Sequence, residues 1–266
     1  TLKVMFTAAL FSTALAAAAQ TLLLSNGFNS ASLPGGWETN AFAAGSGVGA
    51  DPVISFVASS TYSNAVPYEG TYFVKFNSWD CRTNAQLRLV SPVINAGSST
   101  NLSVQFAWFQ DPRTNKDAEG VTLQWTTNNW ATASNVAPFQ MRRGTPTNWV
   151  LRHLALPVQA ISTNLRVGLL FNSSYGNNCY VDDLRVFASA PVTNYPYSEN
   201  FDSGLGLWSC GPGADFTWTR WSGYTPSGAV AGQTTGVSAA QSGSSYLYTE
   251  ATDPNYPSKT AILEAP

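Results

Sequence analysis

The stretch NLSVQFAWF, residues 101–109, decides the fold class. Its apolar residues recur at every second position, and small or polar residues stand between them. Alternation with a period of two is typical of a β-strand that buries one face. Two further stretches, NLRVGLLF (164–171) and CYVDDLRVF (179–187), alternate in the same way. The central part of the chain is therefore predicted to be β-structure.

Turn-forming residues separate such segments at intervals of about ten residues, which is typical of sandwiches. Outside the N-terminus we find no amphipathic helix of ten or more residues. These features predict an all-β protein, a jelly-roll β-sandwich of about nine antiparallel strands. The predicted strands are 22–28, 53–57, 70–77, 85–90, 102–109, 121–126, 149–155, 165–171 and 180–187.

The composition narrows the possible partners. Only 11% of the 266 residues are charged and the formal net charge is −2, whereas 44% are hydrophobic. Ser, Thr, Asn and Gln must therefore supply most of the polar surface. No basic patch is available to neutralise phosphates, so nucleic acid is not expected as a partner.

The N-terminus has the pattern of an export signal. Lys3 precedes the apolar run VMFTAALFSTALA (4–16), which is followed by alanines. We predict a signal peptide over 1–19, cleaved between Ala19 and Gln20, and hence a secreted or cell-surface protein. A buried helix or a membrane anchor is the alternative, but the run is short for a bilayer. No other segment is expected to span a membrane.

One phrase occurs twice in the chain, as NGFNSASLPGGW (26–37) and as ENFDSGLGLW (199–208). Later landmarks keep the spacing, because Pro92 and Pro266 lie 64 and 65 residues after the phenylalanines of the two phrases. This repetition predicts two copies of one domain. The predicted boundaries are 20–188 for the first domain, 189–196 for a linker and 197–266 for the second. The second copy is expected to be incomplete, because it stops where the first half of the first copy ends.

The residues of both copies resemble known families. Residues 22–188 are similar to the cleaved-adhesin jelly rolls of gingipain-type haemagglutinin regions and secreted Bacteroidetes proteins. The segments that carry this are GFNSASLPGGW, GTYFVKFNSWDC, LRLVSPVIN and YGNNCYVDDLRV. Residues 197–266 resemble the first half of a MAM domain, through ENFDSGLGLW, DFTWTRWSGYTPSG, YLYTEA and KTAILEAP.

The resemblance implies a structural calcium ion, held between the first strand and the strand with paired acids. Calcium takes six to eight oxygen ligands from carboxylates, amides, carbonyls and water. The matching positions are Asp182, Asp183, Asn26 and Asn29 in the first copy, and Glu199 and Asp202 in the second. The alternative is that Asp183 pairs with Arg185 or caps a turn. The amides of the first copy should bind calcium more weakly than the acids of the second.

Cysteines and loop tryptophans provide the remaining candidates. In an exported chain, a Cys81–Cys179 disulfide is expected, with two unpaired buried thiols as the alternative. Trp79 and Trp130 lie in turn-like segments, where an exposed indole could bind a sugar ring or a protein partner. The alternative is that both side chains cover the ends of the sandwich.

Catalysis is not expected. The single histidine, His153, lies in a predicted strand, and no G-x-S-x-G motif is present. Asp182 and Asp183 should point to opposite faces of their strand, which separates them as an acid pair. We therefore predict a non-catalytic adhesion or ligand-binding region of a longer secreted or cell-surface bacterial protein. Its partner would be a host or cell-surface protein or a glycan. The alternative is a set of accessory modules, possibly carbohydrate-binding, of a secreted peptidase or hydrolase whose catalytic domain lies outside this chain.

Overall fold

The computed structural model describes eight segments of the chain. They are residues 20–61, 64–110, 119–139, 149–191, 197–211, 214–225, 235–251 and 258–265. The predicted signal peptide and most of the predicted linker lie outside these residues. Within them, the only helix is a single 3-10 turn, Val158–Ala160. No helix in the described part of the chain is long and apolar enough to cross a membrane.

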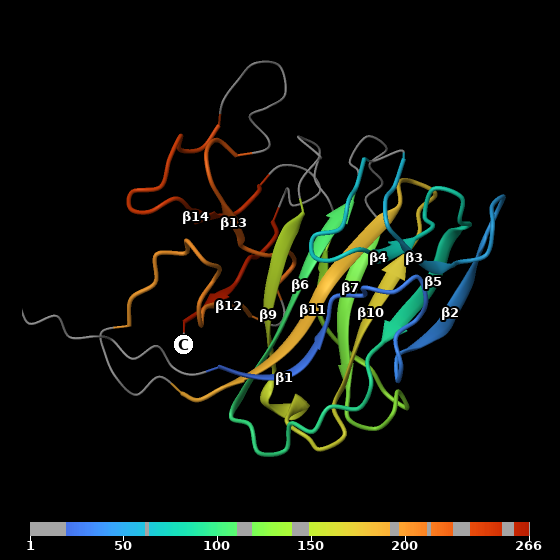
Figure 1. The fold of residues 1–266 in the computed structure, drawn as a ribbon, viewed down its shortest axis with the longest axis horizontal. Coiled ribbons are helices and arrows are strands. Elements are labelled where there is room, and N and C mark those ends of the chain that lie inside the picture. Colours follow the sequence, from blue (N-terminus) through green and yellow to red (C-terminus); the bar gives the residue numbers. More distant parts are fainter. Residues whose placement is uncertain are drawn as a thin grey trace, which may run out of the picture.

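The strands of the first copy pair antiparallel in two sheets that form a β-sandwich, which confirms the predicted all-β jelly roll (Figure 1). The smaller sheet has the order β2-β5-β10-β7-β8, with bounds Glu38–Ser46, Thr83–Val90, Arg166–Asn172, Gly120–Thr126 and Ser134–Phe139. The larger sheet has the order β15-β12-β9-β6-β11-β4-β3, and β1 also pairs with β11. Its strands from the first copy are β1 Gln20–Asn26, β3 Ile54–Val57, β4 Phe73–Phe76, β6 Asn101–Gln110, β9 Val150–Leu156 and β11 Cys179–Ser189.

The alternating residues of β6 fill the space between the sheets. Leu102, Val104, Phe106 and Trp108 are buried in the main hydrophobic cluster, as their period of two predicts. On the opposite side of this sheet, Phe109 belongs to a second cluster with Phe73, Tyr180 and Ala65. Apolar side chains therefore cover part of both sides of the larger sheet.

Strand β11 lies inside the larger sheet, and two strands share one of its edges. Residues 179–181 pair with β4, whereas residues 184–189 pair with β1. The other edge pairs with β6, with a shift of register between Asp182 and Arg185. Asp183 has a φ of 49° at this β-bulge. The bulge therefore lies where the partner of β11 changes from β4 to β1.

The bulge corrects one expectation about the paired acids. A regular strand would place Asp182 and Leu184 on one face and Asp183 on the other. Instead, the extra residue switches the alternation, so that Val181 and Leu184 both enter the main core. Asp182 and Asp183 are both buried.

All nine predicted strands are present, with ends that differ by a few residues. Within the first copy, two described strands were not predicted, namely β2 and β8. They are the two edges of the smaller sheet. Most side chains of β2 are exposed or half-buried, so its sequence ETNAFAAGS lacks an apolar alternation.

The C-terminal region extends the larger sheet. Strand β12, Ser209–Cys210, pairs in parallel with β9, and β15, Leu263–Glu264, pairs with β12. The two remaining strands, β13 Thr219–Trp221 and β14 Tyr246–Tyr248, form a separate hairpin-like pair. Figure 1 shows these orange and red segments beside β9.

One buried arginine links the C-terminal region to the sandwich. Arg152 of β9 donates hydrogen bonds from Nη1 to Thr217 Oγ1 at 2.9 Å and to Thr219 Oγ1 at 2.8 Å. Its guanidinium also lies 5.1 Å from the Trp108 ring centre. Cys210 is 1% exposed and belongs to the main core cluster of the first copy. The two regions therefore share core as well as sheet.

The repeated phrase has the same backbone geometry in both places. Phe28 and Phe201 have positive φ angles of 49° and 63°. The residue two positions earlier caps each turn, because Asn26 Oδ1 accepts from Phe28 N at 2.7 Å and Glu199 Oε1 accepts from Phe201 N at 2.9 Å. The amide and the carboxylate thus serve the same local purpose.

A longer-range contact recurs as well. Asn29 Oδ1 accepts a hydrogen bond from Thr71 N at 2.8 Å, and Asp202 Oδ1 accepts one from Ser244 N at 2.6 Å. Each donor follows a glycine of positive φ, Gly70 or Gly243. A Cβ at Gly70 would lie 1.6 Å from Asn29 Oδ1, so only glycine lets the two segments approach this closely.

We expect residues 197–266 not to fold when expressed without the first copy. Strand β12 would lose its partner β9, and Cys210 would lose the core in which it is buried. The isolated fragment should give a random-coil circular dichroism spectrum and no cooperative melting. A cooperative thermal transition of the fragment alone would contradict this expectation.

Candidate ligand-binding face

One side of the smaller sheet points away from the core and carries aromatic, amide and guanidinium groups. Because side chains alternate along a strand, the neighbours of inward-facing Leu87, Leu89 and Leu169 point outward. We call this surface the outer face. It comprises Phe42, Gln86, Arg88, Thr122, Gln124, Trp130, Asn135, Gly168, Leu170 and Asn172.

A chain of hydrogen bonds crosses the outer face. Arg88 Nε donates to Gln124 Oε1 at 2.7 Å, and Gln124 Nε2 donates to Asn135 Oδ1 at 2.7 Å. A second amide pair joins Gln86 Nε2 to Asn172 Oδ1 at 3.0 Å. These bonds fix the orientation of each amide, so the face presents its polar groups in a set arrangement.

Gly168 makes the contact between Arg88 and Gln124 possible. It lies on β10, between the strands of these two residues. A Cβ at position 168 would stand 2.6 Å from Trp130 Cη2 and 2.9 Å from Arg88 Cδ. The missing side chain therefore leaves the space that the arginine stem and the indole ring occupy.

A tight turn places Trp130 over this space. Asn129 and Trp130 have positive φ angles of 53° and 66°, which are costly for residues other than glycine. Thr126 Oγ1 accepts hydrogen bonds from the backbone of Asn128 at 3.2 Å and of Trp130 at 3.3 Å. Asn129 Oδ1 accepts another from Arg166 Nη1 at 2.9 Å. These contacts hold the turn in its strained conformation.

Two aromatic rings flank the guanidinium of Arg88. Its Cζ lies 4.2 Å from the Trp130 ring centre and 5.2 Å from that of Phe42, within cation–π range. Phe42 is the extra residue of a β-bulge between Ala41 and Ala43, and its side chain is 59% exposed. The bulge directs an apolar ring to the surface beside a charged group.

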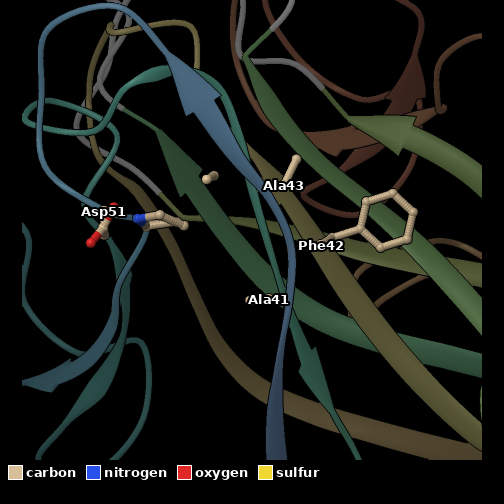
Figure 2. A pocket seen from close by; sticks show the side chains of 6 residues that line it. Ala41, Phe42, Ala43 and Asp51 are labelled. Atoms are coloured by element: carbon tan, nitrogen blue, oxygen red, sulfur yellow. The ribbon is translucent and has the colours of Figure 1, made fainter.

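A shallow pocket of about 370 Å³ lies along the same edge strand. It is lined by Ala41, Phe42, Ala43, Ala44, Asp51 and Pro52. Figure 2 shows Phe42 and Asp51 on either side of β2. The pocket adds a mainly apolar recess next to the polar outer face.

Trp79, the other predicted ligand-binding tryptophan, does not belong to this face. It precedes β5 and is 46% exposed, and its backbone N–H donates to Asn178 Oδ1 at 3.1 Å. Trp130 contacts Arg88, near the opposite end of β5. The structure therefore separates the two tryptophans. Phe42, Arg88 and Gln124 were not predicted from the sequence.

Two residues of the predicted calcium site in the first copy, Asp182 and Asn29, contact residues 68–71, whereas Asn26 caps the Phe28 turn. Asp182 Oδ2 accepts from Tyr68 N at 2.9 Å and Glu69 N at 3.1 Å, and its Oδ1 accepts from Asp183 N at 2.8 Å. Burial raises the pKa of Asp182 to about 6, although these hydrogen bonds act in the opposite direction. Asn29 contacts the same segment through Thr71.

A guanidinium lies among these acids. Asp183 Oδ1 accepts from Arg185 Nε at 2.7 Å, and Arg185 Nη2 donates to Glu69 Oε2 at 2.8 Å. This pairing is the alternative that the sequence left open for Asp183. In the second copy, Arg220 Nε and Nη2 donate to the backbone oxygens of Phe201 and Asp202.

These contacts do not fit a calcium ion as they stand. Calcium needs at least six oxygens directed at one point, but the predicted ligands accept hydrogen bonds from separate N–H and O–H donors. No group of three or more His, Cys, Asp or Glu side chains suited to a metal occurs in the described ranges. Calcium binding stays a prediction.

All three cysteines are buried free thiols, so the expected Cys81–Cys179 disulfide is wrong for this structure. Cys179 Sγ instead accepts a hydrogen bond from Trp108 Nε1 at 3.0 Å. Burial raises the pKa of Cys81 and of Cys179, and raises that of Cys210 to about 11. The thiols are therefore protonated at neutral pH.

His153 has a structural environment. Its Nε2 lies 2.8 Å from Ser103 Oγ, and burial lowers the pKa of the imidazole to about 4. No carboxylate of the described residues is hydrogen-bonded to this ring. The pair therefore lacks the third group that orients the base in a catalytic triad.

Comparisons with known proteins identify similar folds. No protein-family model and no curated protein sequence matches the chain. The K1 cleaved adhesin domain of Lys-gingipain from Porphyromonas gingivalis W83 is similar over 63% of this chain and 98% of that domain, at 16% identity and a TM-score of 0.44. The CBM22-1 xylan-binding domain of Paenibacillus barcinonensis Xyn10C is similar over 66% of this chain and 100% of that domain, at 16% identity and a TM-score of 0.42.

A third similar structure is TmCBM61, solved in complex with β-1,4-galactotriose. It is similar over 58% of this chain and 89% of that chain, at 14% identity and a TM-score of 0.38. Because all these identities and TM-scores are low, any ligand of this chain must be argued from its own residues.

Thiol counting tests whether the three cysteines are free thiols. The unreduced protein, denatured and treated with an alkylating reagent, should gain three labels per chain. The folded protein should gain none, because all three thiols are buried and protonated. A single label on the denatured, unreduced chain would show that two cysteines are bridged.

One substitution tests the role of Arg185, and chelation tests calcium binding. Because its guanidinium pairs with Asp183 and Glu69, Arg185→Gln should lower stability by about 1–3 kcal/mol, the cost of an unsatisfied buried carboxylate. Calcium binding stays a prediction, and it would raise the melting temperature of the parent protein in excess calcium chloride relative to excess EDTA, because a ligand of the folded state raises its stability. Equal melting temperatures in the two conditions would contradict it.

Proposed function

We propose that the first jelly roll, residues 20–188, is a non-catalytic module that binds a glycan on the outer face of its smaller sheet. The observation that carries the proposal is the arrangement of Phe42 and Trp130 around Arg88, beside oriented amides. A sugar ring has apolar C–H faces and a rim of hydroxyls. Aromatic rings suit the first, and fixed amide and guanidinium donors suit the second.

Most polar side chains on this face are neutral amides, which favours a sugar over a nucleic acid as the ligand. Gln86, Gln124, Asn135 and Asn172 are neutral and can each donate and accept hydrogen bonds. Hydroxyl groups have the same dual character, so amides match them without a net charge. A protein partner that covers the same face is the alternative, and it would also contact Phe42.

We propose a wider setting that follows the sequence resemblance. The chain would be exported by residues 1–19 and act as an adhesion or ligand-binding region of a secreted or cell-surface bacterial protein. Residues 197–266 would belong to a second, MAM-type jelly roll that follows a linker at 189–196. The recurrence of the Phe28 turn at Phe201 supports a shared origin of the two copies. Under the alternative setting, the same modules would assist a secreted hydrolase or peptidase.

Glycan-array binding of the whole chain tests the proposed function. The chain should bind at least one glycan, and Phe42→Ala should weaken that binding by about tenfold, or about 1.4 kcal/mol. Phe42 is the suitable variant because its ring is largely exposed, so its removal should leave the melting temperature unchanged. Trp130→Ala should weaken binding at least as much.

Trp79→Ala is the matched control. It removes an exposed aromatic ring from a place outside the outer face, and it should leave glycan binding unchanged. No binding to any glycan, or equal binding by the parent chain and Phe42→Ala, would overturn the proposed function. Loss of binding in Trp79→Ala alone would place the ligand at the other end of the sandwich.

A further inference from the structure

Arg88 has an environment that a structural arginine rarely has. It is 5% exposed, and its only described hydrogen bond is the one from Nε to Gln124. None of the ion pairs in the described residues includes it. Buried charges in proteins are normally paired, because their removal from water is costly. Arg88 therefore carries a positive charge that nothing described on the protein neutralises.

The two acids in β2 and the segment after it, Glu38 and Asp51, already form ion pairs with other arginines. Glu38 Oε1 accepts from Arg166 Nη2 at 2.8 Å, and Asp51 pairs with Arg82. The amides around Arg88 are neutral. Burial also lowers the pKa of Arg88, and no neighbouring charge contributes to that shift. The outer face thus has one excess positive charge at its centre.

The terminal nitrogens of Arg88 are available to a ligand. A guanidinium has five N–H donors, and Nη1 and Nη2 have no hydrogen-bond partner among the described residues. Neither nitrogen is among the fully enclosed polar atoms without a partner, so both keep some contact with solvent. Phe42 and Trp130 exclude water from the two sides of the group, which strengthens any pairing formed there.

Resting on the proposed function, we infer that the glycan bound by the outer face is acidic and that its carboxylate pairs with Arg88. The planar fork of a guanidinium matches the two oxygens of a carboxylate. A uronic acid combines such a carboxylate with the apolar ring face that Phe42 can contact. Arg88 is thereby a specificity-determining residue, and the amides position the hydroxyls of the sugar.

Affinity electrophoresis of the whole chain tests this inference, with acidic polysaccharides such as homogalacturonan, alginate and glucuronoxylan in the gel. The matched probes are the same polysaccharides after chemical reduction of their carboxyl groups to alcohols. At least one acidic polysaccharide should retard the chain, and its reduced form should bind about 10- to 100-fold more weakly, as expected from the loss of a charge-assisted hydrogen bond.

Two variants locate the effect. Arg88→Gln should lose the preference for the acidic form, and Arg88→Lys should keep part of it because it retains the charge without the fork. Arg82→Gln is the control, because it makes the same change of net charge outside the outer face and should leave the preference intact. Melting curves show whether each variant is folded. The comparison of acidic and reduced polysaccharides on the parent chain stands even if Arg88→Gln unfolds.

The outcomes distinguish failure of the acidic ligand from failure of the glycan-binding function. Equal binding of acidic and reduced polysaccharides, with both weakened by Phe42→Ala, would overturn the acidic ligand and leave the glycan-binding function in place. A preference for acid that Arg88→Gln retains and Arg82→Gln loses would also overturn it. No retardation by any neutral or acidic polysaccharide would overturn both.

Discussion

The two strands that share one edge of β11 impose the constraint on which the sandwich depends. Residues 179–181 of β11 pair with β4, and residues 184–189 pair with β1. Asp182 and Asp183, which lie between these two pairings, therefore have no strand partner on that edge. Asp182 is buried, and a buried carboxylate needs hydrogen-bond donors. The backbone N–H groups of Tyr68 and Glu69 donate to it at this break. The bulge at Asp183 then returns Leu184 to the core. The acids in this apolar strand are therefore needed where one strand partner replaces another.

Features that leave a repeating pattern in the local sequence could be predicted. The alternation in β6 identified the sandwich, and the recurrence of the Phe28 turn at Phe201 was visible as a repeated phrase. The bulge was not visible, because a period-two reading assumes a regular strand, and YVDDLRV fits that reading well. Strand β2 was missed for a different reason. An edge strand with exposed side chains on both faces has no apolar alternation to detect.

Most of the outer face was unpredictable for a related reason. Phe42 lies on a missed edge strand, and its exposure follows from a bulge. Arg88, Gln124 and Trp130 meet because β10 lies between β5 and β7 and has glycine at position 168. Sheet order brings these residues together, and no local pattern records it. Trp130 was identified as a candidate from its turn-like sequence alone, which shows that a loop aromatic can be found where its partners cannot.

The buried thiols give the chain an unequal response to oxidation. In the folded state, Cys81, Cys179 and Cys210 are protonated and enclosed, so an oxidant finds no thiolate to attack. The unfolded chain exposes all three, and any disulfide formed there joins sulfurs that the native core holds apart as free thiols. Oxidation would thus form disulfides only in unfolded chains and prevent them from refolding, while folded chains would not react. In an oxidising compartment, the lifetime of this protein would be set by how often it unfolds.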